Sequence, residues 1–189
     1  MNISANESKK VLELFNVKNT AEYVQYIHRG NCEHPCPDCI SNNLRIFDND
    51  KKKPPVGEAN HPHCDCYYTD VQTKAIGSIS QKGNESPDVY LKLYGHLPDY
   101  YITKEEAINK YGWDSSKNTL SGKAPGFMIG GDVFKNRDKL LPVKTGRVWY
   151  ECDIDYISGK RNSKRLYYSN DGLMFFSPDH YQGTFYYLK

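Results

Sequence analysis

The C-terminal part of the chain contains residue types that can act on a phosphodiester by acid–base chemistry. Glu151 supplies a carboxylate and His180 an imidazole, groups that commonly serve as general base and general acid. Cations able to stabilise charge on phosphoryl oxygens lie in the same half: Lys104, Arg137, Arg161 and Arg165. Residue types alone leave two interpretations open, because a single glutamate on a strand is commonly solvated and a single histidine is commonly structural.

A second set of reactive side chains is concentrated before residue 67. Five of the six cysteines and four of the six histidines lie between positions 28 and 66. Two cysteines spaced as Cys-x-x-Cys, followed after a loop by a His-Pro-His-Cys-Asp-Cys run, are typical of a tetrahedral structural zinc site. The predicted ligands are Cys36, Cys39, His61 and one of Cys64 and Cys66. We expect Cys32, His34 and His63 to be solvent-exposed or outside the coordination sphere.

Two other chemistries compete with zinc at these cysteines. Disulfides suit a secreted chain, but the first ten residues contain no apolar stretch of a signal peptide. A redox Cys-x-x-Cys needs a strand before it and a helix N-terminus around it, and the sequence indicates neither. The remaining cysteine, Cys152, is expected to face the core and to be inert, because neighbours along a strand point to opposite faces.

The elements that must position these residues change in kind along the chain. Ser4 and Glu7 form a capping box that predicts a first helix, and a second helix is expected from Thr20 to His28. Gly- and Ser-rich residues 77–86 are typical of a linker. Further helices are predicted over Asp88–Gly95 and from Thr103 to near Gly112, and strands over Arg147–Asp153, Lys164–Ser169, Leu173–Ser177 and Thr184–Leu188.

This order predicts an α+β fold in two parts. A small helical, zinc-stapled Cys/His-rich module should occupy residues 1–76, and a domain of helices packed on a four- to five-stranded antiparallel sheet residues 87–189. The net charge of +2 does not mark a nucleic-acid binder, although a nuclease needs only local positive charge at its cleft. No apolar run is long enough to span a membrane. The missing signal peptide favours the cytoplasm, or export by a non-classical or phage-linked route.

From about Tyr90 to the C-terminus the chain resembles the barnase-type family of bacterial guanyl-preferring ribonucleases. The agreement is nearly gapless and covers these stretches: His96–Trp113, Ala124–Arg137, Leu141–Glu151, Asp153–Arg165, Tyr168–Asp171 and Asp179–Tyr181. The resemblance implies the microbial ribonuclease fold, with Glu151 as general base and His180 as general acid. Lys104, Arg161 and Arg165 would surround the scissile phosphate, and no cofactor would be needed for catalysis. RNA would yield a 2′,3′-cyclic phosphate that is then hydrolysed.

The resemblance also implies a guanine-binding loop. Its residues here would be Phe134, Lys135, Asn136, Arg137 and Asp138, with Tyr181 beside the substrate. Lys135 replaces a small polar residue of the family and Asp138 a longer glutamate, departures that bear on the strength of guanine preference. Four further family positions are expected to hold salt bridges that support the sheet and cleft: Asp132, Arg147, Asp153 and Asp171.

The Cys/His stretch is similar to a short segment of phage Mu-type head morphogenesis proteins. The shared elements are Cys36, Cys39, Pro54-Pro55 and His61 through Cys66. The two resemblances together imply a bacterial or phage toxin that acts on RNA, an acidic inhibitor similar to barstar, and a module that anchors the toxin to a phage or effector-delivery particle. The competing hypothesis is a non-catalytic phage-assembly or RNA-binding protein with an inactive nuclease-like domain. The presence of both Glu151 and His180 favours the enzyme.

Overall fold

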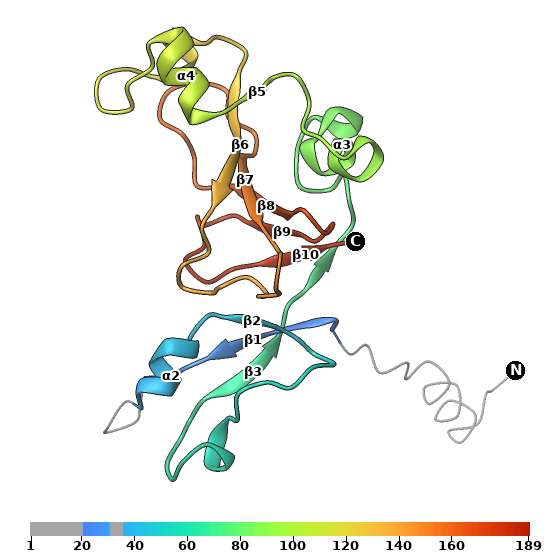
Figure 1. The fold of residues 1–189 in the computed structure, drawn as a ribbon, viewed down its shortest axis with the longest axis vertical. Coiled ribbons are helices and arrows are strands. Elements are labelled where there is room, and N and C mark those ends of the chain that lie inside the picture. Colours follow the sequence, from blue (N-terminus) through green and yellow to red (C-terminus); the bar gives the residue numbers. More distant parts are fainter. Residues whose placement is uncertain (1–20, 31–35) are drawn as a thin grey trace, which may run out of the picture.

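The computed structural model describes residues 21–30 and 36–189. These residues form two sheets, one of three strands and one of seven (Figure 1). The helix predicted from the Ser4–Glu7 capping box, together with Cys32 and His34, lies outside the described residues. Within the described residues no helix combines the length and apolar character that crossing a membrane would require.

The smaller sheet has the order β2-β1-β3 and is antiparallel throughout. Its elements are β1 (Tyr23–Ile27), α2 (Pro37–Asn42), β2 (Ile46–Asp48) and β3 (Tyr67–Asp70), with a 3₁₀ turn at Gly57–Ala59. We call these described residues, 21–30 and 36–71, the Cys/His module. Within these residues the predicted Thr20–His28 helix was wrong, since its described part forms strand β1, and α2 is the one α-helix among them.

The reason for the error lies in the burial of β1. Tyr23, Val24, Gln25 and Tyr26 are all buried in succession, so no alternation of buried and exposed residues marks the segment as a strand. Aromatic and β-branched residues suit a pleated surface. Pairing with β2 on one edge and β3 on the other then decides the conformation.

The larger sheet has the order β4-β10-β9-β8-β7-β6-β5. Its five inner strands are antiparallel neighbours: β6 (Met128–Phe134), β7 (Trp149–Asp153), β8 (Arg165–Ser169), β9 (Met174–Ser177) and β10 (Tyr186–Leu188). The last four coincide with the predicted strands. Short parallel partners, β4 (Thr73–Lys74) and β5 (Tyr101–Ile102), extend the sheet at both edges, which the predicted four to five strands did not include.

Helices α3 (Pro87–Tyr94) and α4 (Lys104–Tyr111) form where they were predicted, and α5 (Leu120–Lys123) adds one further turn. The Thr103–Glu106 capping box is complete, and Gly112 ends α4 with a φ of 66°. A positive φ is available to glycine without a side-chain clash. In Figure 1 both longer helices lie at the end of the larger sheet that is remote from the Cys/His module.

The two sheets share a core. Tyr23, Ile46 and Val71 of the module pack into one cluster with Trp149 and Phe175 of the larger sheet. The segment 77–86, predicted as a linker, also packs: Ile79 is buried, and the Ser80 hydroxyl and Gln81 amide both donate to Asp155, at 2.8 and 3.0 Å. Its Gly/Ser composition concealed this one apolar anchor, so the expected flexible spacer is corrected to an ordered connection.

Candidate active site

One face of the larger sheet carries most of the predicted catalytic side chains. Opposed residues of an antiparallel pair share a face, as do residues two apart along a strand. Glu151 on β7 opposes Tyr167 on β8, and Asp153 opposes Arg165. A bulge at Gly131, whose φ is 91°, brings Asp132 of β6 opposite Glu151 on the same face. The other face carries Cys152, which is buried as predicted.

Helix α4 directs a lysine onto the candidate base. Lys104 Nζ donates to Glu151 Oε1 at 2.6 Å, and the glutamate side chain is 14% exposed. The backbone amide of Lys104 donates to the Asp132 carboxylate at 3.1 Å. Burial raises the pKa of Asp132 above its ordinary value, although that amide bond opposes the rise. The start of α4 is therefore fixed to β6 and β7 together.

A buried carboxylate positions the two candidate phosphate-binding arginines. Arg161 donates to both oxygens of Asp153 at 2.7 Å, and Arg165 Nη1 lies 3.2 Å from one of them. The Asp153 side chain is fully buried and that of Arg165 is 5% exposed. Charge-assisted pairs of this kind hold guanidinium planes in a defined orientation. These contacts confirm the prediction that Asp153 is a salt-bridge partner. The same prediction is confirmed for Arg147 and Asp171, because Arg147 donates to both oxygens of Asp171 at 2.8 Å.

His180 lies in the loop that follows β9, in a left-handed conformation with φ of 58°. The Asp179 carboxylate fixes this loop, because it accepts from the Ser177 hydroxyl at 2.7 Å and from two later backbone amides, those of Gln182 and Thr184, at 3.1 and 3.0 Å. Burial, and then the nearby Arg165 guanidinium, lower the pKa of His180 below 6.5, while the Glu151 carboxylate opposes this. The imidazole therefore shares one electrostatic environment with the candidate base and cations.

The candidate base-binding loop follows β6. Phe134 lies 4.7 Å from the ring of Tyr167 and 5.8 Å from that of Tyr181, centroid to centroid, so three aromatic rings adjoin the loop. Asn136 closes the loop, since its side chain donates to the Leu141 carbonyl at 2.9 Å and accepts from the Leu141 amide at 3.1 Å. The remaining predicted residues of the loop, Lys135, Arg137 and Asp138, are exposed.

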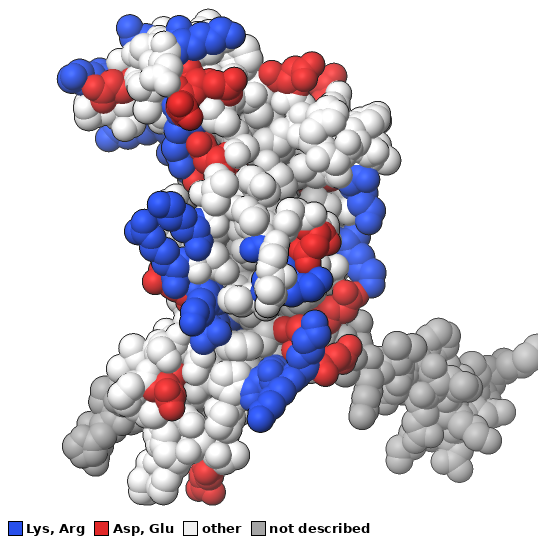
Figure 2. Space-filling view, in the orientation of Figure 1, with Lys and Arg blue, Asp and Glu red and all other residues white. Residues whose placement is uncertain are grey.

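Two buried polar atoms on this face have no hydrogen-bond partner among the described residues: Arg165 Nε and the Tyr167 hydroxyl. Tyr167 was not among the predicted site residues. The strand periodicity that placed Arg165 on the cleft side also places Tyr167 there, two positions further on, and was the signal that could have found it. In Figure 2, Lys and Arg gather over the middle of the drawn face, whereas the far end of the module is largely uncharged.

The predicted metal ligands also converge, around Cys39. Its sulfur lies 3.3 Å from His61 Nε2 and 3.8 Å from the sulfur of Cys64. Cys36, Cys39 and His61 place their donor atoms within 4.8 Å of one another, and so do His28, Cys39 and Cys66. His28 was not predicted as a ligand. It lies outside the spaced motif, and only the antiparallel pairing of β1 with β3 brings it to Cys66.

A family model described as ribonuclease matches residues 59–186, more than half of the chain. The chain therefore belongs to the ribonuclease family, and it is a ribonuclease.

Three relatives bear the name ribonuclease, and each is 53% identical over 92 residues, which is 49% of this chain. The alignment covers 84% of the relative from Heyndrickxia coagulans. It covers 56% of those from Bacillus intermedius and Bacillus pumilus, so the chain spans little more than half of these two.

Proposed function

We propose that this ribonuclease is an endonuclease that cleaves single-stranded RNA by transphosphorylation, without a metal in the catalytic step. The observation that carries the proposal is the ion-pair network on one face of the sheet, in which Lys104 contacts Glu151, and Asp153 holds Arg161 and Arg165. His180 adjoins this face, because the ring of its neighbour Tyr181 lies 6.3 Å from that of Tyr167, the residue opposite Glu151. Metal-free cleavage of RNA needs a base, an acid and stabilisation of phosphoryl charge, and this set supplies each.

In the first step the Glu151 carboxylate takes the proton of the ribose 2′-hydroxyl. The 2′-oxygen then attacks phosphorus, and protonated His180 gives its proton to the departing 5′-oxygen. The product is a 2′,3′-cyclic phosphate. In the second step the roles exchange: neutral His180 takes a proton from water, whose oxygen attacks phosphorus. The bond from phosphorus to the 2′-oxygen breaks, protonated Glu151 gives its proton to that oxygen, and a 3′-phosphate results. DNA lacks the 2′-hydroxyl and is not a substrate.

The cations would stabilise the negative charge that develops on the phosphoryl oxygens. Asp153 holds Arg161 and Arg165 in place before substrate arrives, so little reorganisation is needed during reaction. Among the described residues, Arg165 Nε and the Tyr167 hydroxyl are buried donors without an acceptor. Leaving a buried donor unpaired costs free energy of folding.

Guanine preference is proposed for the loop that begins at Phe134. Its backbone amides would meet O6 of the base, the Asp138 carboxylate would accept from N1 and N2, and Phe134 and Arg137 would frame the ring. The partly buried rings of Phe134 and Tyr181, whose centroids are 5.8 Å apart, support this assignment, since bases stack on exposed aromatic faces.

The biological role, the inhibitor and the metal of this protein are also part of the proposal. A ribonuclease of this kind would act as a toxin, and an acidic inhibitor of the barstar type would cover its cleft. The Cys/His module would bind a structural metal, with zinc as the fitting ion for thiolate and imidazole donors, and would attach the enzyme to a phage or effector-delivery particle.

The test is cleavage of an RNA oligonucleotide by the purified chain in excess chelator. The chain should cleave, whereas Glu151→Ala and His180→Ala should each lose about 10²- to 10⁴-fold in kcat/KM. Glu105→Ala, at an exposed glutamate of α4, is the matched control and should retain full activity. An intact chain that binds RNA but does not cleave it would instead support the non-catalytic alternative.

A further inference from the structure

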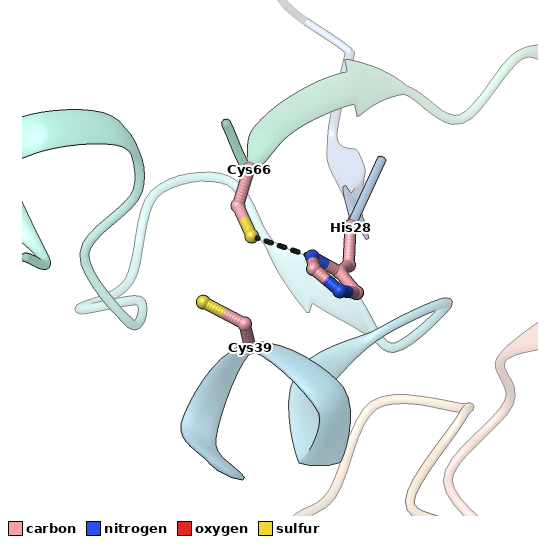
Figure 3. Close-up of side chains that lie close together, drawn as sticks. All are labelled: His28, Cys39 and Cys66. Atoms are coloured by element: carbon pink, nitrogen blue, oxygen red, sulfur yellow. Dashed lines mark hydrogen bonds between the residues drawn. The ribbon is translucent and has the colours of Figure 1, made fainter. Parts of the chain in front are cut away.

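The Cys/His module brings donor atoms from three separate segments to one place. His28 follows β1, Cys39 lies on α2, and Cys66 immediately precedes β3. Figure 3 shows their side chains pointing toward a common centre, with the sulfur of Cys66 3.4 Å from His28 Nδ1. The sulfur of Cys64 is 3.8 Å from that of Cys39, although Cys64 is outside the group of three whose donor atoms all lie within 4.8 Å of one another. It would complete the site as a fourth ligand after a small movement toward that group.

These separations match the edges of a metal-centred tetrahedron. With zinc–sulfur bonds of about 2.3 Å and zinc–nitrogen bonds of about 2.0 Å, two sulfur ligands lie about 3.8 Å apart and a sulfur–nitrogen pair about 3.5 Å apart. The Cys39–Cys64 and Cys66–His28 distances, 3.8 and 3.4 Å, agree with both values.

The surroundings suit thiolates. The side-chain amide of Asn60 donates to the sulfur of Cys39 at 3.2 Å and to that of Cys64 at 3.7 Å, and the Tyr26 hydroxyl donates to Cys39 at 3.6 Å. Donors aimed at sulfur stabilise its negative charge and orient it, as outer partners do around bound metals. Three neutral thiols would gain less from this arrangement.

The composition of the local core points in the same direction. Its buried members are Tyr26, Cys39, Cys64 and Cys66, so three of these four residues are sulfur donors. An apolar cluster this small stabilises a fold weakly, and small modules of this kind commonly depend on a metal.

We propose that His28, Cys39, Cys64 and Cys66 hold one zinc-class divalent ion that fastens β1, α2 and β3 together. The group of His28, Cys39 and Cys66 contains two buried thiols, whereas the group of Cys36, Cys39 and His61 contains one. The more enclosed donors therefore form the site, and Cys36 and His61 are neighbours of it. This ligand set rests on the proposed structural metal and is independent of the RNA-cleavage proposal.

The test compares two histidine variants in the full-length chain. Zinc content after purification, and zinc affinity against a competing chelator, are measured for wild type, His28→Ala and His61→Ala. Wild type should hold one zinc per chain. His28→Ala should weaken binding by more than about 100-fold, since changes outside the coordination sphere alone cost about 10- to 100-fold. His61→Ala, which removes only a neighbour of the ligand Cys39, should cost no more than about 10- to 100-fold.

Cobalt substitution checks the sulfur ligands. The sulfur-to-cobalt charge-transfer band should lose intensity in Cys39→Ser, Cys64→Ser and Cys66→Ser and keep it in Cys36→Ser. Cleavage of RNA by each variant reports that the rest of the chain is folded. A metal-free wild type would overturn the structural metal itself. If His28→Ala leaves zinc affinity unchanged, or if His61→Ala lowers it equally, this ligand set is wrong. The proposal of RNA cleavage would stand in either case.

Discussion

The two sheets of this protein are held together by different means. The larger sheet buries extended apolar clusters on both faces and keeps its charged residues in paired networks such as Arg161–Asp153–Arg165. The Cys/His module has a small core in which sulfur predominates. The candidate acid–base site therefore lies on the part with the larger apolar clusters, and the proposed ion belongs to the part with the small core.

The Cys/His module contacts the part of the chain that forms the larger sheet. The backbone amide of Ile46, on β2 of the module, donates to the Leu140 carbonyl at 2.7 Å, and Leu140 belongs to the segment that follows the candidate base-binding loop. Leu44 lies against Gly183 in the loop that carries His180. The module therefore packs against the segments next to the candidate base-binding loop and the loop of His180.

The largest expected effect comes from Asp153→Asn. Removing this carboxylate leaves Arg161 and Arg165 without their shared partner in a buried setting, which should cost about 3–5 kcal/mol in the free energy of unfolding. Urea denaturation measures it. Asp114→Asn, in an exposed pair with Lys117, is the control and should leave the midpoint unchanged. Equal effects of the two substitutions would show that the buried pairing does not hold the sheet.

The junction should be the next most sensitive place. Ile46 is 2% exposed, and Ile46→Ala should destabilise the chain by about 2–5 kcal/mol through lost burial and a residual cavity. KM for RNA should rise while kcat changes little, because the base-binding loop loses its support. Steady-state kinetics and thermal unfolding measure both quantities. Ile40→Ala, at a 55% exposed position of the same module, should change neither.

The pH profile tests the role of His180. The acid must be protonated to donate, and burial followed by Arg165 lowers its pKa below 6.5 in the free enzyme. The value of kcat/KM should therefore fall as pH rises, by about tenfold per pH unit, beginning below pH 6.5. A descending limb that begins above 6.5 would contradict this assignment. The limb should be absent in His180→Ala.

The smallest effect concerns base choice. Asp138 is exposed at the tip of the loop and is one carbon shorter than the glutamate of the family pattern. Asp138→Glu should raise the preference for guanine over adenine by about tenfold, the value of one hydrogen bond to a charged group. Cleavage of dinucleotides that differ in the first base gives this ratio. Asp138→Glu with unchanged preference would remove the carboxylate from the proposed recognition.

Sequence patterns predicted the larger sheet well because its signals are local. Strands β7 to β10 are short aromatic-rich runs separated by turn residues such as Asn170-Asp171-Gly172, and α4 begins at a capping box and ends at a glycine. The register of those strands, together with the family resemblance, is enough to bring Glu151 near Lys104. Where signals were not local, prediction failed: β1 is buried along four successive residues, and His28 reaches Cys66 only through strand pairing.

Tyr167 and the 77–86 segment are two further features that depend on long-range contacts. Tyr167 has an ordinary strand pattern, and its unpartnered hydroxyl is visible only when the neighbours are in place. Ile79 is a single apolar residue in a polar stretch, so the overall composition of the stretch did not indicate that this residue is buried in the core. Properties that depend on a few long-range contacts are absent from any window of sequence.

The most direct test of the central claim is product analysis with the metal removed. The full chain, stripped by a strong chelator, is incubated with an RNA oligonucleotide that contains one guanosine, and the new ends are identified. We predict continued cleavage after that guanosine, with a 2′,3′-cyclic phosphate that later opens. Cleavage that stops until zinc is restored, or that leaves a 3′-hydroxyl from the start, would contradict it.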